Sequence, residues 1–109
     1  MDNENESEYV RVPLPKKQEN EMFAVVDRRL GGSRMNVSCS DGKSRLARIP
    51  GRKKRKLKRI RDGDLLIISP WDIQDEKADI IYKYRNNQTL LLKKKNLLSE
   101  EIIIFLLGV

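Results

Sequence analysis

Apolar and polar residues alternate along two stretches of the chain, residues 33–39 and 78–85. This two-residue period is typical of strands with one face in a core and the other in water. Residues 22–30 are rich in β-forming side chains, and residues 43–49 follow as another strand. Residues 65–69 are almost continuously apolar, which predicts a strand covered on both faces. The pattern therefore predicts five strands.

Glycine-containing turns separate these strands. Gly31-Gly32 and Asp41-Gly42 join the first three, and Asp62-Gly63 precedes the fourth, which Pro70 ends. Five strands with short turns favour a small barrel or sandwich. The interruption between the third and fourth strands, filled by a helix-like segment, favours the all-β, five-stranded oligonucleotide/oligosaccharide-binding (OB) barrel.

The two ends of the chain differ from this β pattern. Residues 1–21 contain six acidic residues, two prolines and few apolar side chains, so we predict a flexible N-terminal arm before a barrel domain over residues 22–85. Residues 86–109 are predicted to form a C-terminal helix and an apolar tail. Asn87 is the expected cap of a helix over residues 88–98, and Ser99 with two following acids predicts a second cap.

The apolar tail, residues 102–107, fits a helix or a strand equally well. Six consecutive apolar residues are unfavourable if all are exposed. We therefore expect the tail to pack partly on the barrel through Ile103 and Phe105, with other side chains left exposed. The tail is too short to span a bilayer.

Positive charge is concentrated between residues 51 and 61, where the sequence is GRKKRKLKRIR. Eight of these eleven residues are basic, and the rest of the chain, with 15 basic and 16 acidic residues, is almost neutral. A focused positive field attracts polyanions. Leu57 and Ile60 are the expected anchors of this segment on the core. Alternative interpretations are a solvated loop or a nuclear localisation signal, but nucleic-acid contact is favoured.

Aromatic residues are few where a single-strand binder would need them. The hairpin over residues 33–49 has none, and Trp71, Tyr82 and Tyr84 are expected to pack in the core or at its rim. A binder with many bases and few exposed rings is expected to contact phosphates and RNA shape rather than to read sequence.

Several kinds of chemistry have no support in the composition. The chain has no histidine and a single cysteine, Cys39, which we expect to be a buried strand thiol. The acidic residues Asp72, Asp75, Glu76 and Asp79 are interpreted as a solvated loop rather than a magnesium site. We therefore predict a protein that is not an enzyme and has no cofactor, in the reducing cytoplasm and not in a membrane.

A specific resemblance lies in this same region. Residues 41–71, DGKSRLARIPGRKKRKLKRIRDGDLLIISPW, and residues 75–84, DEKADIIYKY, resemble translation initiation factor 1A of archaea and eukaryotes. With LGGSR upstream, the resemblance covers residues 22 to about 95. It implies the OB barrel with a C-terminal helix. It also implies binding to small-subunit ribosomal RNA at the A site, beside the decoding helix, and help with initiator tRNA loading and start-site selection. The expected partners are other initiation factors, and the free protein is expected to be a monomer.

The candidate RNA-binding residues come from three sources. The resemblance implies Arg45, Arg48, Arg52, Lys53, Lys54, Arg55, Lys58 and Arg61, with Lys43 and Trp71 as weaker candidates. The basic run adds Lys56 and Arg59, and the alternation of the fifth strand adds Lys83 and Arg85.

The chain departs from the family at three places. It lacks an aromatic before RDGD, it lacks a long acidic C-terminal tail, and its N-terminal arm is acidic. Its short ends are more similar to archaeal members, although organelle or protist versions remain alternatives. Two other functional classes also stay open, a general single-strand chaperone of the cold-shock type and a nuclease. The missing aromatics count against the chaperone, and the missing histidine counts against the nuclease.

Overall fold

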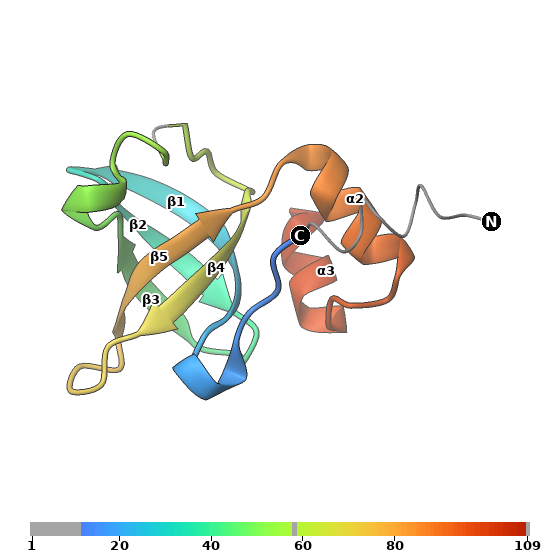
Figure 1. The fold of residues 1–109 in the computed structure, drawn as a ribbon, viewed down its shortest axis with the longest axis horizontal. Helices are drawn as coiled ribbons and strands as arrows, with labels where there is room; N and C mark the ends of the chain where they lie inside the picture. The colour runs from blue at the N-terminus through green and yellow to red at the C-terminus, as the bar shows by residue number, and fades with distance from the viewer. Residues whose placement is uncertain (1–11, 58, 109) are drawn as a thin grey trace.

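The computed structural model describes residues 12–57 and 59–108. Five strands form a closed barrel in the order β1-β2-β3-β5-β4, and β3 and β5 are its one parallel pair. The strands are β1 (Met22–Gly31), β2 (Arg34–Cys39), β3 (Ser44–Arg48), β4 (Leu65–Pro70) and β5 (Lys77–Lys83). Figure 1 shows the barrel with two C-terminal helices at one side. The predicted all-β OB barrel and its five strands are confirmed.

Strand β4 separates two hydrophobic clusters. Leu66 and Ile68 belong to the cluster inside the barrel, whereas Leu65 and Ile67 belong to a second cluster between the barrel and the helices. All four side chains are at most 2% exposed. Successive side chains of a strand point to opposite faces, so an apolar run is what a strand between two cores requires. The prediction that this strand is covered on both faces is confirmed.

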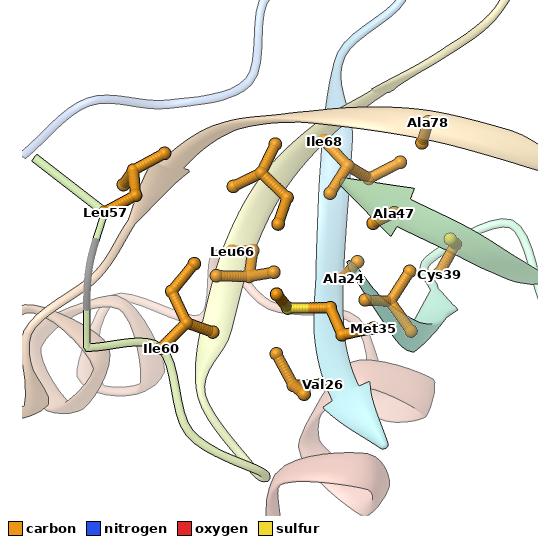
Figure 2. Close-up of a cluster of buried hydrophobic side chains, with 12 residues drawn as sticks. Ala24, Val26, Met35, Cys39, Ala47, Leu57, Ile60, Leu66, Ile68 and Ala78 are labelled. Carbon is orange, nitrogen blue, oxygen red and sulfur yellow. The ribbon is translucent and has the colours of Figure 1, made fainter. Parts of the chain in front are cut away.

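The basic segment is anchored as predicted but is less helical. It contains one 3-10 turn, η2 (Gly51–Lys53), and then hydrogen-bonded turns, including Leu57 N–H donating to the Lys53 carbonyl over 3.0 Å. Leu57 and Ile60 are 6% and 1% exposed and belong to the cluster inside the barrel, which Figure 2 shows. Adjacent like charges destabilise successive helical turns, which favours this irregular path between the two anchors.

The C-terminal helices differ from the predicted ranges. Helix α2 (Asn86–Lys94) begins two residues before and ends four residues before the expected helix over 88–98. Gln88 Oε1 accepts the Arg85 N–H over 2.9 Å, so Arg85 rather than Asn87 is the N-cap residue. Asn96 is left-handed, with φ of 58°, and stops the helix. Sequence periodicity alone does not reveal either boundary.

The apolar tail is helical. Helix α3 (Glu100–Leu106) begins at Ser99, whose Oγ accepts the Ile102 N–H over 3.3 Å, and this confirms the second predicted cap. Ile102 is fully buried in the second cluster, where Ile103 and Phe105 are partly buried. Ile104 and Leu107 are 48% and 65% exposed. Partial packing is therefore confirmed, although Ile102 is the main anchor.

The described part of the N-terminal arm is packed against the fold. Val12 is 7% exposed and belongs to the second cluster with Tyr84 and Leu92. The Tyr84 hydroxyl donates to the Pro13 carbonyl, and a 3-10 turn, η1 (Lys17–Glu19), leads into β1. Strand β1 begins at Met22, where the sequence placed the start of the barrel, but the chain is already packed on the fold at Val12. A single valine between Arg11 and Pro13 is a weak sequence signal. Residues 1–11, also assigned to a flexible arm, lie outside the described residues.

Candidate nucleic-acid interface

The basic segment continues β3 along the edge of β5. The pairing of β3 with β5 reaches Arg48 opposite Asp79, and beyond it Lys53 Nζ donates to the Ile81 carbonyl over 3.0 Å. Next to this contact, a cleft of about 390 Å³ lies between the two segments. We call it the basic cleft, because its lining includes four cationic side chains; its residues are Lys53, Lys56, Leu57, Ile81, Tyr82, Lys83 and Arg85.

Positive charge in the basic cleft is largely uncompensated. Lys83 Nζ lies 3.7 Å from Asp64 Oδ2. Lys53, Lys56 and Arg85 form no ion pair with any residue in the described ranges 12–57 and 59–108. Cations gathered in a concave site without acidic partners create a local positive potential. The basic cleft is therefore the strongest candidate anion-binding site on this side of the barrel.

The remaining bases of the segment extend this positive surface. They are exposed, and none forms an ion pair with a described residue; they are Arg52, Lys54, Arg55, Arg59 and Arg61. The anchors Leu57 and Ile60 hold the backbone while these side chains stay in solvent. Lys58 lies outside the described residues.

Arg48 and Trp71 form a separate cluster with Asp79. Asp79 Oδ1 accepts from Arg48 Nε at 3.1 Å and from Trp71 Nε1 at 3.0 Å. The Arg48 guanidinium carbon lies 4.9 Å from the Trp71 ring centroid, and Lys77 Nζ lies 5.4 Å from it. Cations on an indole ring are attracted to its π face. Trp71 thus packs at the rim, as the sequence predicted, while Arg48 keeps a half-exposed side chain.

Arg45 and Lys43 lie at the other end of β3 and are neutralised by carboxylates. The Arg45 side chain is 2% exposed, and its NH2 group lies 2.9 Å from Asp41 and 3.1 Å from Asp75. Lys43 Nζ lies 3.0 Å from Asp75. We call these four residues the Arg45 cluster. Arg45, which the sequence predicted as an RNA contact, therefore lies outside the basic cleft and is held by two carboxylates of the fold.

The electrostatics of the Arg45 cluster agree with this position. Hydrogen bonding from Arg45 lowers the pKa of the Asp41 carboxyl, and hydrogen bonds from Lys43 and then Arg45 lower that of Asp75. The same bond to Asp41 raises the pKa of Arg45. Asp75 and Asp79, two acids that the sequence assigned to a solvated loop, therefore serve as ion-pair partners, and Asp79 lies in β5 rather than in the loop. In the described ranges no group of three metal-ligating side chains is present.

Sequence reasoning missed three arginines on the neighbouring hairpin, Arg28, Arg29 and Arg34, all exposed. Arg34 lies directly opposite Arg48 in the β2–β3 register. Like charges opposite each other on a sheet are unfavourable unless an anion binds there. The alternation in residues 33–39 already predicted that Arg34 lies on the polar face of its strand, so the sequence could have identified it as an exposed base.

Two smaller sequence predictions concern Cys39 and the membrane. Cys39 is fully buried in the barrel, and this burial raises the pKa of its thiol. It is therefore the buried strand thiol that the alternation predicted. None of the helices in the described part of the chain is long and apolar enough to cross a membrane.

Comparison with known proteins identifies the family of this chain. Residues 10–105 match the family model of Translation initiation factor 1A / IF-1. Translation initiation factor 1A of Picrophilus torridus is 44% identical over 105 residues, which are 96% of each chain. The Thermoplasma acidophilum protein of the same name is 46% identical over 94% of this chain and 85% of its own. The solution structure of a translation initiation factor from a Wolbachia endosymbiont of Brugia malayi has 24% identity and a TM-score of 0.46, covering 63% of this chain and 82% of its own. The match over nearly the whole length establishes that this chain belongs to the translation initiation factor 1A family.

Proposed function

We propose that this protein binds small-subunit ribosomal RNA at the A site, beside the decoding helix, and helps initiator tRNA loading and start-site selection. The observation that carries the RNA-binding step is the basic cleft, continuous with an anchored segment whose exposed bases lack acidic partners among the described residues. Family membership supports the location at the A site. The protein acts as a monomer together with other initiation factors.

The proposed RNA contacts form three groups. The central group is the basic run and the strand end beside it: Arg52, Lys53, Lys54, Arg55, Lys56, Lys58, Arg59, Arg61, Lys83 and Arg85. Arg48 and Arg34 extend it over the hairpin. Lys43 and Trp71 lie at the periphery of this surface. Arg45 contributes indirectly by stabilising the fold, since its guanidinium is buried between two carboxylates.

The contacts are of a kind that grips the phosphate backbone. Lysine and arginine are the main partners of phosphates, and such contacts position a protein without reading bases. Trp71 is in contact with two cations, Tyr84 is buried, and Tyr82, which lines the basic cleft, packs edge-on against Tyr84. Recognition therefore depends on RNA shape. The proposed role includes no catalysis, and we expect no RNA or nucleotide hydrolysis in the presence of Mg²⁺, Mn²⁺ or Zn²⁺.

Binding to isolated small subunits at a series of salt concentrations tests this proposal. Each lost phosphate contact should reduce the log–log salt slope by about 0.7 to 0.9, so the variant R52A/K53A/K54A/R55A should lose about 3 units. The matched control, K16A/K17A/K93A/K94A, removes four cations outside the basic run. Its slope should change far less. An unchanged slope in the first variant would remove the segment from the interface.

Chemical footprinting of the subunit RNA then tests the location. Protection of A-site nucleotides by the wild type, and its loss in R52A/K53A/K54A/R55A, is the expected result. If unstructured poly(U) competes as strongly as the subunit and no nucleotides are protected, the protein is the general single-strand binder instead.

A further inference from the structure

Asp79 contacts Arg48 through a single guanidinium nitrogen. Its Oδ1 accepts from Arg48 Nε at 3.1 Å, and the two terminal NH2 groups of Arg48 form no hydrogen bond with residues 12–57 or 59–108. In Arg45, by contrast, all three guanidinium nitrogens are engaged, by both Asp41 oxygens and by the Asp75 carbonyl. The Arg48 side chain is 54% exposed, against 2% for Arg45. Asp79 therefore holds Arg48 without covering the end of its guanidinium.

Trp71 restricts the same guanidinium from a second direction. Its indole N–H donates to the same Asp79 oxygen over 3.0 Å, and the Arg48 guanidinium carbon lies 4.9 Å from the ring centroid. One carboxylate oxygen thus connects the ring and the cation. A free arginine side chain loses rotamer entropy when a ligand fixes it, and here part of that loss has occurred before any ligand binds. Arg48 is therefore preorganised.

The strand register puts a second arginine on the other side of Arg48. Asp79 is the partner of Arg48 on β5, and Arg34 is its partner on β2. Directly opposite residues on neighbouring antiparallel strands project from the same face of the sheet. Arg34 is exposed and forms no ion pair within the part of the chain that the structure describes. An oxyanion bound between Arg34 and Arg48 would relieve the repulsion between them.

We propose that Asp79 is a positioning residue that directs the terminal NH2 groups of Arg48 toward an RNA phosphate, which Arg34 contacts from the neighbouring strand. The inference rests on the proposed function, in which both arginines contact RNA. The terminal edge of a guanidinium offers two parallel N–H donors, and these match two oxygens of one phosphate. The negative charge of Asp79 by itself opposes RNA binding. Charge and geometry therefore predict opposite effects when Asp79 is replaced.

Two variants that remove the same charge separate these effects. In Asp79→Asn, the amide oxygen can still accept from Arg48 and Trp71, so affinity for isolated small subunits should equal or exceed that of the wild type. In Asp79→Ala no acceptor remains, and affinity at about 0.1 M salt should fall about two- to fivefold, no more than the loss of one phosphate contact. Equal affinities of the two variants, whether above or below the wild type, would overturn the inference.

Urea denaturation checks that both variants are folded. If Asp79→Ala is too unstable for the binding assay, Asp79→Val replaces it, because valine also lacks an acceptor and has a higher β propensity. The double variant R48A/D79A then assigns the effect to Arg48. It should bind at least as tightly as R48A, since no guanidinium remains to be positioned. A further loss beyond that of R48A would contradict the proposal.

The free protein provides a test that contains no RNA. Trp71 is the only tryptophan of the chain, so its indole N–H gives a single NMR signal. Arg48→Ala should shift this signal by removing the cation from the ring, and should shift it far less in the D79A background, where Arg48 is no longer held there. Equal shifts in both backgrounds would refute the positioning role. Failure of the wild type to bind small subunits would instead refute the proposed function, so the two failures are distinguishable.

Discussion

The basic cleft and the Arg45 cluster both contain lysine and arginine, yet the fold uses these cations for different purposes. In the Arg45 cluster, a guanidinium with 2% exposure lies between Asp41 and Asp75. In the basic cleft, one of the four cations, Lys83, has a carboxylate partner among the described residues, Asp64 at 3.7 Å. Paired and buried charge contributes to folding, whereas unpaired and exposed charge is available to a partner. Residue type alone therefore does not identify an RNA contact.

Arg45→Ala should have the largest effect in this comparison. Breaking a buried ion pair usually costs about 3–5 kcal/mol, but Asp41 and Asp75 can regain water, so we expect about 2–3 kcal/mol lower free energy of unfolding. Urea denaturation measures it. Lys43→Ala is the control, since its side chain is 64% exposed and such pairs contribute about 0–1 kcal/mol. Equal losses in both variants would contradict the structural role of Arg45.

The double variant K83A/R85A should weaken RNA binding and leave the stability of the fold almost unchanged, the reverse of what we expect for Arg45→Ala. Two lost phosphate contacts predict roughly 10- to 50-fold weaker binding to small subunits at about 0.1 M salt and a slope lower by about 1.4 to 1.8. The free energy of unfolding should stay within about 0.5 kcal/mol of the wild type, because surface substitutions have small effects. A loss of stability as large as that of Arg45→Ala would remove the distinction between the two regions.

Arg48 is the intermediate case, because it is paired with Asp79 but half-exposed. Arg48→Ala should lower stability by about 1 kcal/mol, from the ion pair and the Trp71 contact together. It should also weaken RNA binding by about three- to sixfold, the effect of one phosphate contact. Arg48→Lys should restore binding more fully than stability, since lysine keeps the charge but not the planar contact. Denaturation and binding assays on both variants distinguish these contributions.

The smallest expected effect is on the stability of the fold at acidic pH. The pKa values of Asp41 and Asp75 are lowered in the fold, so these groups stabilise it above their unfolded value, near 3.9. That contribution is lost as the pH falls below about 4 and through the lower folded values. Arg45→Ala should therefore lose less stability than the wild type between about pH 5 and pH 2. Denaturation at several pH values measures the difference, and parallel curves would show that Arg45 does not hold these carboxylates.

Much of the fold follows from local patterns. Alternation placed β2 and β5, and the unbroken apolar run of β4 predicted a strand between two cores. The spacing of Leu57 and Ile60 predicted the anchors of the basic segment, and Ser99 with two acids predicted the start of α3. These signals depend on neighbours in the chain, and strand and helix periods express them directly.

The sequence by itself determined that a focused positive segment lies between the third and fourth strands of a small β barrel. The tertiary structure decided which bases remain available, because ion pairs such as Arg45 with Asp75 join residues 30 positions apart. It also decided that Val12 and Tyr84 belong to one hydrophobic cluster and that Lys83 and Arg85 share a cleft with Lys53 and Lys56. Such contacts come from strand pairing across the barrel, and no local pattern of residues encodes which distant carboxylate meets which base.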